Sequence, residues 1–337
     1  MQSSRFDYEL PAERIAQEPA HPRDGSRLLV DRGPGADPDH RLTRDLPDLV
    51  GPGDLLVVND TRVLPARLML RKPTGGAVEV LLLDPRPAAG EWEALVRPGR
   101  RVPPGTELAL DDDGPTVLTV NERVDGGRRV VGFADASSIS ALLDRHGQVP
   151  LPPYISATDI DTERYQTVYA DRPASVAAPT AGLHLTDEVI GRCRAAGAGF
   201  EKVELVVGLD TFRPITAADI ADHPMHTESY RLGSETLRRC AAAERVIAVG
   251  TTVVRALEAA AASGETAGRT DLFIRPGFEF GVVDALLTNF HLPRSTLLVL
   301  VESLIGPRWR SLYQTALDGG YRFLSFGDAM FVERAGP

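Results

Sequence analysis

The feature that most constrains the fold is a change of pattern between residues 63 and 148. This stretch contains short apolar or alternating runs, among them AVEVLLLD, EWEALV, TELAL, PTVLTVNERV and RRVVGFA, and the turn sequences between them are TGG, RPG, PPG, DDDG and DGG. Short strands at regular spacing with glycine and proline turns are typical of a small all-β barrel or sandwich. We therefore predict an all-β module here.

The two flanks of this module have a different pattern. Residues 1–60 contain helical and extended pieces that end in the strand GDLLVVND, and after residue 150 strands alternate with helices. The predicted strands there are KVELVVGL, VIAVG, LFIRPG and ALLTNF, and the predicted helices are SETLRRCAAAE, TVVRALEAAAASGE and STLLVLVESLIG. This alternation indicates an α/β domain.

The simplest architecture is a large discontinuous α/β domain, residues 1–62 and 149–337, with a small all-β barrel, residues 63–148, inserted into it. The chain of 337 residues is long enough for two domains. Insertion at a surface turn is tolerated because the two chain ends lie close together there.

The composition excludes several classes of protein. Hydrophobic residues make up 43% and charged residues 25% of the chain, which rules out collagen-like, disordered and coiled-coil chains. Cys193 and Cys240 fit neither a disulfide framework nor a zinc module. No apolar run approaches the ~20 residues that span a bilayer, so we expect a cytoplasmic protein with no membrane contact. The net charge of −10 disfavours general nucleic-acid binding but does not exclude a local basic groove.

Polar residues follow the strand GDLLVVND at the point where it ends. The sequence NDTRVLPAR places Asn59, Asp60, Thr61, Arg62 and Arg67 just beyond that buried strand. Proteins of the α/β class collect ligand-binding groups at such strand ends. A turn with an Asn or Asp cap and a salt-bridged arginine explains the same residues without a ligand.

The segment SVAAPTAGLHLT is small and uncharged up to Gly182 and then offers His184. Small residues let a ligand approach the backbone, and an imidazole can exchange a proton near neutral pH. The alternative is a plain loop in which Thr186 caps the next helix.

The segment HPMHTESY brings His223, His226 and Glu228 close together in sequence. Proton transfer or substrate binding by His226 and Glu228 is the favoured interpretation. A metal site would need a further ligand such as His291, the spacing is not HExxH, and Pro224 disfavours a regular helix there.

The segment VGTTVVRALE follows an apolar strand with a glycine turn and opens a helix. Gly250, Thr251 and Thr252 resemble a helix N-terminus that holds a carboxylate or a phosphate, although GxGxxG and the Walker pattern are absent. Arg255 and Glu258, three residues apart on the helix, can equally pair with each other.

The segment DALLTNFHLPRST ends a strand with Asn289 and His291. The carboxamide of Asn289 has two donors and an acceptor, which suit the edge of a purine base. A capped turn between strand and helix is the alternative.

In this order, these blocks closely resemble the S-adenosylmethionine:tRNA ribosyltransferase-isomerase family of queuosine biosynthesis. The resemblance extends from Phe6 to about Phe331. Besides the segments above it includes FDYELPAERIAQEPAHPRDGSRLLV, PLPPYI, ERYQTVYA, VGLDTFRPI, FIRPGFEFGVVDALLTNFHLPRSTLLVLV and YRFLSFGDAMF.

The resemblance implies an enzyme that moves the ribosyl unit of S-adenosylmethionine onto 7-aminomethyl-7-deazaguanine at the tRNA wobble position. Adenine and methionine leave, and the product is epoxyqueuosine in tRNA. The implied partner is tRNA with a GUN anticodon, which reads Asn, Asp, His or Tyr codons. No metal or cofactor is expected, because S-adenosylmethionine is a consumed substrate. We expect a monomer, and the implied fold is a large α/β domain with an inserted β-barrel.

Within this reaction we assign roles from residue chemistry and motif position. Residues predicted to transfer protons are His184, His226 and Glu228, with His291 as an alternative. Residues predicted to bind S-adenosylmethionine are Thr180, Gly182 and Asn289 for the adenine, and Thr251, Thr252 and Arg255 for the methionine carboxylate. Residues predicted to contact tRNA phosphate, in a basic strip beside the cleft, are Arg62, Arg67 and Arg213.

The chain departs from the family pattern in a few places. Leu185 replaces an aromatic residue, Arg275 stands where an aromatic residue usually precedes the PG turn, Glu302 and Ser303 interrupt an apolar helix, and DRPASV lacks the usual glycine. Two other classes therefore stay open. One is a paralogue that binds tRNA or S-adenosylmethionine without catalysis; the other is a metal-dependent hydrolase built on His223, His226, Glu228 and His291.

Overall fold

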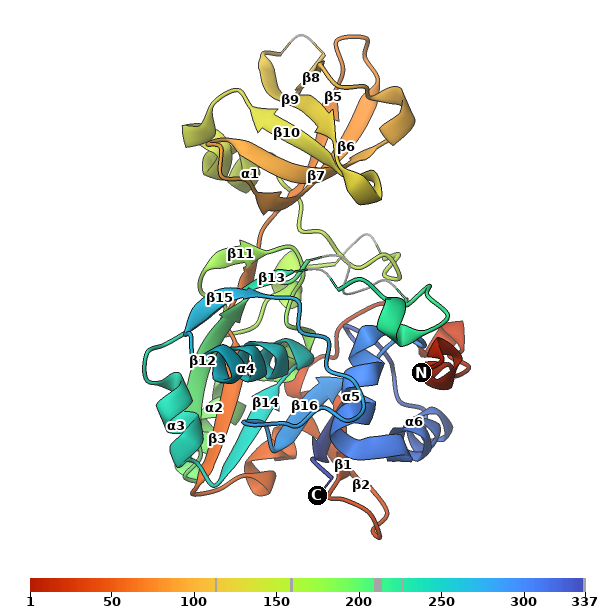
Figure 1. Ribbon diagram of the computed structural model, residues 1–337, viewed down its shortest axis with the longest axis vertical. Coiled ribbons are helices and arrows are strands. Elements are labelled where there is room, and N and C mark those ends of the chain that lie inside the picture. The colour runs from red at the N-terminus through yellow and green to blue at the C-terminus, as the bar shows by residue number, and fades with distance from the viewer. Residues whose placement is uncertain (113, 158–159, 209–213, 226, 336–337) are drawn as a thin grey trace. The chain divides into compact units, whose positions relative to one another are not determined.

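The computed structural model describes residues 1–112, 114–157, 160–208, 214–225 and 227–335 (Figure 1). The chain divides into two compact units, residues 1–62 together with 152–337, and residues 63–151. The sequence prediction ended the inserted segment at residue 148, three residues earlier. Gln148 exchanges two backbone hydrogen bonds with Arg67, and this bridge keeps the chain in the smaller unit past that point.

The smaller unit is a closed barrel of six antiparallel strands in the order β10-β7-β6-β5-β8-β9. Its elements are β5 (Arg67–Arg71), β6 (Ala77–Pro85), β7 (Glu91–Arg97), β8 (Thr106–Ala109), β9 (Thr116–Arg123), β10 (Arg129–Phe133) and the helix α1 (Ile139–His146). Alternate residues of β6, namely Val78, Val80 and Leu82, are fully buried. Side chains therefore fill the barrel interior, and the all-β prediction for this segment is confirmed.

The larger unit is built on a nine-stranded sheet in the order β15-β13-β12-β3-β14-β16-β17-β1-β2. Its strands are β1 (Arg27–Asp31), β2 (Asp39–Leu42), β3 (Asp54–Asn59), β12 (Gly199–Leu205), β13 (Glu228–Leu232), β14 (Arg245–Val249), β15 (Ala267–Thr270), β16 (Ala285–Asn289) and β17 (Ala329–Glu333). Two further short strands are β4 (Arg62–Val63) and β11 (Pro173–Ser175). The four neighbours β12, β3, β14 and β16 run parallel, so their carboxyl ends meet at one edge of the sheet.

Helices cover both faces of this sheet, as Figure 1 shows for α4 and its neighbours. They are α2 (Asp187–Ala195), α3 (Thr236–Ala242), α4 (Thr251–Ser263), α5 (Thr296–Ile305) and α6 (Trp309–Asp318). Leu55 and Val57 of β3 belong to the core beneath α4, α5 and α6, whereas Leu56 and Val58 belong to the core beneath α2. Burial on both faces explains why β3 is a continuous apolar run, and the α/β prediction is confirmed. None of the helices in the described part of the chain is long and apolar enough to cross a membrane.

The predicted strand LFIRPG is wrong. The strand of this region, β15, lies just before it at Ala267–Thr270 and pairs with β13. The carbonyl of Leu272 accepts a hydrogen bond of 3.1 Å from Nε of Arg255 on α4 instead of joining a ladder. The carbonyl of Leu272 is therefore paired with a helix side chain rather than with a neighbouring strand.

Candidate active site

A pocket opens at the carboxyl ends of β14 and β16, with about 620 Å³ of unfilled space including the part open to solvent. The lining consists of residues 178–181, 250–252 and 288–292 with Tyr154, Val207, Ser295, Leu297, Leu324 and Ser325. The edge where parallel strands end is the usual place for a ligand in an α/β fold.

The N-terminus of α4 forms one wall of this pocket. Gly250 precedes the helix with a φ of +100°, a conformation that L side chains rarely adopt. The first intrahelical bond is donated by Val253 to the carbonyl of Gly250, so the amides of Thr251 and Thr252 come before it. Free amides at a helix start are a binding site for a carboxylate or a phosphate. Both threonines line the pocket, and their role in binding a carboxylate stays a prediction.

Asn289, the last residue of β16, forms the opposite wall. Its Oδ1 accepts a hydrogen bond of 2.9 Å from the hydroxyl of Thr180, which lies on the 3₁₀ helix η9 (Thr180–His184). Its Nδ2 lies 3.0 Å from Nε2 of His184 and 3.4 Å from the carbonyl oxygen of Asp328. Because a carbonyl oxygen can only accept, the atom facing Asp328 is the amide nitrogen, and this fixes the orientation of the carboxamide.

His184 is thereby held in one protonation state. Nδ2 of Asn289 donates to its Nε2, so the ring is neutral and carries its proton on Nδ1. Burial, with smaller effects of Arg322 and Arg23, lowers the pKa of His184 to about 4. Its side chain is buried behind Asn289, and His184 is not among the residues that line the pocket.

His291 does line the pocket, two residues beyond Asn289. Its Nε2 lies 3.0 Å from the hydroxyl of Thr288. Its backbone is anchored by two tyrosines: its amide donates to Tyr313, and the hydroxyl of Tyr8 donates to its carbonyl. Burial lowers the pKa of His291 to about 3, so this ring too is neutral at physiological pH.

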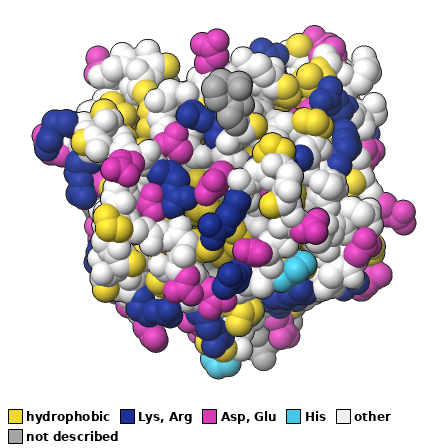
Figure 2. Space-filling model, turned by 90° about the horizontal axis from the view of Figure 1, so that it is seen from below, with side chains coloured by type: hydrophobic (Ala, Val, Ile, Leu, Met, Phe, Trp, Pro, Cys, Tyr) yellow, Lys and Arg dark blue, Asp and Glu magenta, His cyan; other side chains and the backbone are white. Residues whose placement is uncertain are grey.

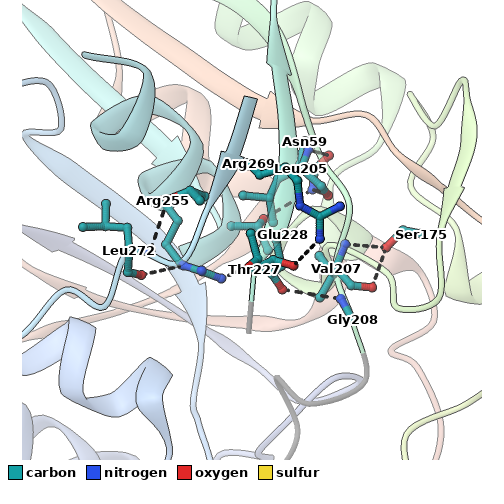
Figure 3. Close-up of polar contacts among 12 residues, drawn as sticks. Asn59, Ser175, Leu205, Val207, Gly208, Thr227, Glu228, Arg255, Arg269 and Leu272 are labelled. Carbon is teal, nitrogen blue, oxygen red and sulfur yellow. Dashed lines mark hydrogen bonds and ion pairs between the residues drawn. The ribbon is translucent and has the colours of Figure 1, made fainter. Parts of the chain in front are cut away.

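Glu228 and Arg255, which the sequence analysis placed in separate roles, form a buried ion pair (Figure 3). Their side chains are only 7% and 8% exposed. Glu228 opens β13, and its Oε1 also accepts from the amide of Gly208 at 3.4 Å. Arg255 also donates from Nε to Leu272, while its Nη2 is buried with no hydrogen-bond partner among the described residues. Neither residue lines the pocket.

The alternative pairing of Arg255 with Glu258 is wrong. The carboxylate of Glu258 instead accepts hydrogen bonds of 2.9–3.1 Å from the backbone amides of residues 281–283. It thereby holds the loop that leads into β16. Glu258 therefore has a structural role on the face of α4 that packs against that loop.

Gly182 lies outside the pocket lining, although it was predicted to contact the adenine. A Cβ at this position would lie 1.9 Å from the hydroxyl of Tyr169. The glycine therefore permits the close packing of Tyr169, a residue of the ERYQTVYA block. That contact explains its presence without a ligand.

Three further residues line the pocket without a role predicted from the sequence: Tyr154, Ser325 and Thr288. The hydroxyls of Tyr154 and Ser325 lie 2.6 Å apart. Tyr154 belongs to PLPPYI and Ser325 to SFGDAMF, two family blocks that were noted without an assigned role. Their presence among those blocks was the signal that could have found them.

The arginines predicted to contact tRNA lie in different parts of the chain. Arg62, in the larger unit, pairs with Glu163 at 2.5 Å on the surface. Arg67 begins the barrel strand β5, and its Nε is buried without a hydrogen-bond partner. On the face that Figure 2 shows, basic and acidic side chains are interspersed rather than gathered by sign. The basic strip stays a prediction.

Two predicted site residues, His226 and Arg213, lie outside the described residues. Within the described ranges, no group of three or more His, Cys, Asp or Glu side chains is placed to hold a metal ion. The described members of the metal-site alternative are thus not brought together, and the ring of His223 packs edge-on against Phe273.

Fold and site together define an α/β protein with an inserted antiparallel barrel and a pocket at the carboxyl edge of its main sheet. A family model described as queuosine biosynthesis protein matches residues 3–332. The chain belongs to this family.

Curated relatives match over nearly their whole length. An S-adenosylmethionine:tRNA ribosyltransferase-isomerase of Rubrobacter xylanophilus is 50% identical, with 98% of each chain covered. A protein of the same name from Thermotoga maritima is 47% identical, with 98% of this chain and all of the relative covered. The crystal structure of an S-adenosylmethionine tRNA ribosyltransferase from Thermotoga maritima is similar, with a TM-score of 0.56 and 39% identity over 98% of this chain and 100% of that one.

Proposed function

We propose that this protein is an S-adenosylmethionine:tRNA ribosyltransferase-isomerase. It transfers and isomerises the ribosyl unit of S-adenosylmethionine onto 7-aminomethyl-7-deazaguanine in tRNA, which gives epoxyqueuosine and releases adenine and methionine. The observation that carries this conclusion is the full-length match to relatives of that name, at 50% identity in the case of Rubrobacter xylanophilus. The pocket adds physical support, because the helix N-terminus in its wall suits a ligand that carries a carboxylate.

S-adenosylmethionine is placed by two groups of the pocket wall. The amides of Thr251 and Thr252 at the start of α4 bind the methionine carboxylate. Arg255 stays a candidate for the same carboxylate, although its guanidinium pairs with Glu228 outside the pocket lining. Thr180 and Asn289 bind the adenine across the pocket.

The reaction needs positioned proton transfer more than any other protein chemistry. The sulfonium makes the neighbouring 5′ carbon acidic, so a base removes a proton there as adenine leaves the ribose. The aminomethyl nitrogen adds to the resulting electrophile, and epoxide closure expels methionine. His184 and His291, with pKa values lowered to about 4 and 3, are weak bases. We therefore assign proton transfer first to His226, and keep Glu228, which pairs with Arg255 outside the pocket lining, as the second candidate.

The finer features of the function are part of the same proposal. The tRNA carries a GUN anticodon and presents the base at its wobble position, and the enzyme works as a cytoplasmic monomer without metal or cofactor. A net charge of −10 is compatible with this substrate, because anticodon loops are recognised by shape and stacking as much as by charge. Arg62, Arg67 and Arg213 are proposed to contact its phosphates.

The test is incubation with S-adenosylmethionine and an anticodon stem-loop that carries 7-aminomethyl-7-deazaguanine. Mass analysis of the nucleosides should find epoxyqueuosine with one adenine and one methionine released per product. A stem-loop that carries guanine at the same position is the control and should give no product. If both substrates bind and no epoxyqueuosine forms, the protein is a non-catalytic paralogue and the proposal is wrong.

A further inference from the structure

The polar wall of the pocket has a fixed hydrogen-bonding polarity. The hydroxyl of Thr180 gives its proton to Oδ1 of Asn289, and both amide protons of Asn289 point away from the pocket, one toward His184 and one toward the Asp328 carbonyl. The hydrogen-bonding capacity that these two side chains do not use consists of acceptor lone pairs, on Oγ1 of Thr180 and on Oδ1 of Asn289. Both residues line the pocket. A ligand therefore meets acceptors on this wall.

We propose that this wall selects the 6-amino group of adenine in S-adenosylmethionine, and that His184 is the positioning residue that sets the wall's polarity. The inference rests on the proposed function and deepens it. An exocyclic amine supplies the N–H that Thr180 and Asn289 can accept, whereas a 6-oxo purine would place an acceptor against acceptors. A site built to bind a donor rejects an analogue that lacks it, because its own polar groups are left unpaired.

His184 controls this polarity because it is the acceptor that orders the Asn289 carboxamide. The ring is buried and neutral, and a neutral imidazole with its proton on Nδ1 offers a lone pair at Nε2. The Asp328 carbonyl holds the same amide nitrogen at the longer distance of 3.4 Å. Without the imidazole acceptor, one amide proton of Asn289 is unpaired and the carboxamide can turn its nitrogen toward the pocket.

The experiment measures binding of two unreactive nucleosides to the full-length protein by calorimetry. The probes are 5′-methylthioadenosine and 5′-methylthioinosine, which share sugar and thioether and differ by amine or carbonyl at purine position 6. We expect the adenosine probe to bind at least about tenfold more tightly to the wild type, the effect of one hydrogen bond gained or lost. Equal binding of both probes, or binding of neither, overturns the proposal.

Two matched pairs of variants test the residues. Thr180→Val, which removes the hydroxyl at nearly constant volume, should bring the ratio of the two dissociation constants close to one, while Thr180→Ser should retain it. His184→Leu should lower the preference for the adenosine probe. His184→Gln, whose side-chain oxygen can accept from Asn289, should keep that preference at the wild-type level. A folded His184→Leu protein that keeps the wild-type ratio overturns the role of His184; if that variant does not fold, the threonine pair decides.

These measurements separate the inference from the proposed function. Neither probe can react, so discrimination between them does not depend on turnover. A wild type that distinguishes the probes but makes no epoxyqueuosine contradicts the proposed function alone. A wild type that makes epoxyqueuosine but binds both probes equally contradicts the inference alone.

Discussion

Two buried polar clusters lie at the same edge of the main sheet and are built in opposite ways. Around Asn289, every group is neutral, and the contacts are hydrogen bonds among an amide, an imidazole, a hydroxyl and a carbonyl. Glu228, by contrast, forms a buried ion pair with Arg255. A neutral network is sensitive to the orientation of its groups, whereas a buried ion pair is sensitive to the loss of either charge. The two clusters should therefore respond to different perturbations.

The largest effect is expected from removing one charge of the ion pair. Arg255→Met removes the guanidinium that faces the buried carboxylate of Glu228, which should lower the free energy of unfolding by about 3–5 kcal/mol. Urea denaturation followed by circular dichroism measures the change. The double variant Glu228→Gln with Arg255→Met removes both charges and should recover much of the loss. A cost below about 1 kcal/mol for Arg255→Met would show that the pair is not buried in solution.

Acid should weaken the neutral cluster around Asn289 and His184. The pKa of His184 is lowered in the folded state to about 4, so the unfolded chain binds the extra proton at higher pH than the folded chain does. The stability that depends on neutral His184 is complete above pH 6.5 and falls by about 1.4 kcal/mol per pH unit from there toward pH 4.

The matched variant for this measurement is His184→Gln, which cannot take up the proton. Between pH 7 and pH 4.5, the free energy of unfolding of the wild type should fall by about 3 kcal/mol more than that of the variant. The other titrating groups, His291 included, are the same in both proteins and cancel in the difference. Parallel curves would mean that His184 is free to protonate in the folded state.

The sequence predicted the outline of these clusters and missed their pairings. Asn289 and Thr180 were assigned to the site because strand ends and small-residue loops collect ligand groups, and both do line the pocket. The partners of Asn289 lie 105 and 39 residues away, on η9 and beside β17, so local spacing carries no information about them. Topology brings them together.

The same reason explains the error at Arg255. Helical spacing made Glu258 its nearest acidic neighbour in sequence. The fold instead places Glu228, 27 residues away on β13, against the guanidinium, and turns Glu258 toward a loop. The barrel was predictable because its turns and alternating strands are local features, whereas the choice among several acidic partners is a property of the packed sheet.

A smaller effect is expected at Gly250, which precedes α4 in the pocket wall opposite Asn289. Gly250→Ala forces a Cβ onto a residue with a φ of +100°, at a cost of about 1–2 kcal/mol. The nearest atoms to that Cβ, on Thr252 and Ala181, are at ordinary contact distances, so the strain lies in the backbone. Relief of that strain would move the amides of Thr251 and Thr252, so KM for S-adenosylmethionine should rise severalfold.

Gly264→Ala is the control for this prediction. Gly264 follows the other end of α4 with a φ of +74° and has no atom within 4 Å of the added Cβ. Gly264→Ala should lower the free energy of unfolding by a similar amount and leave KM for S-adenosylmethionine unchanged. Equal KM changes in both variants would show that helix stability, rather than the position of the first amides, controls substrate binding.

The smallest effect on stability is expected at Arg62, whose proposed role is on the surface. Its pair with Glu163 joins a side chain that is 36% exposed to one that is 66% exposed, so Arg62→Ala should change the free energy of unfolding by no more than about 0.5 kcal/mol. Its effect on tRNA binding should be larger. If Arg62 contacts one phosphate, the slope of log Kd against log salt should fall by about 0.7–0.9 in the variant, because one fewer counterion is released.

Arg238→Ala supplies the matched control, since Arg238 is also exposed and also paired, with Glu235 three residues earlier. It lies on α3, which precedes β14 at the edge of the sheet opposite the pocket. Its salt slope should equal that of the wild type. Equal slopes for the Arg62 variant and the wild type would show that Arg62 does not contact a tRNA phosphate. The proposed substrate contacts would then be those of the pocket wall around Asn289.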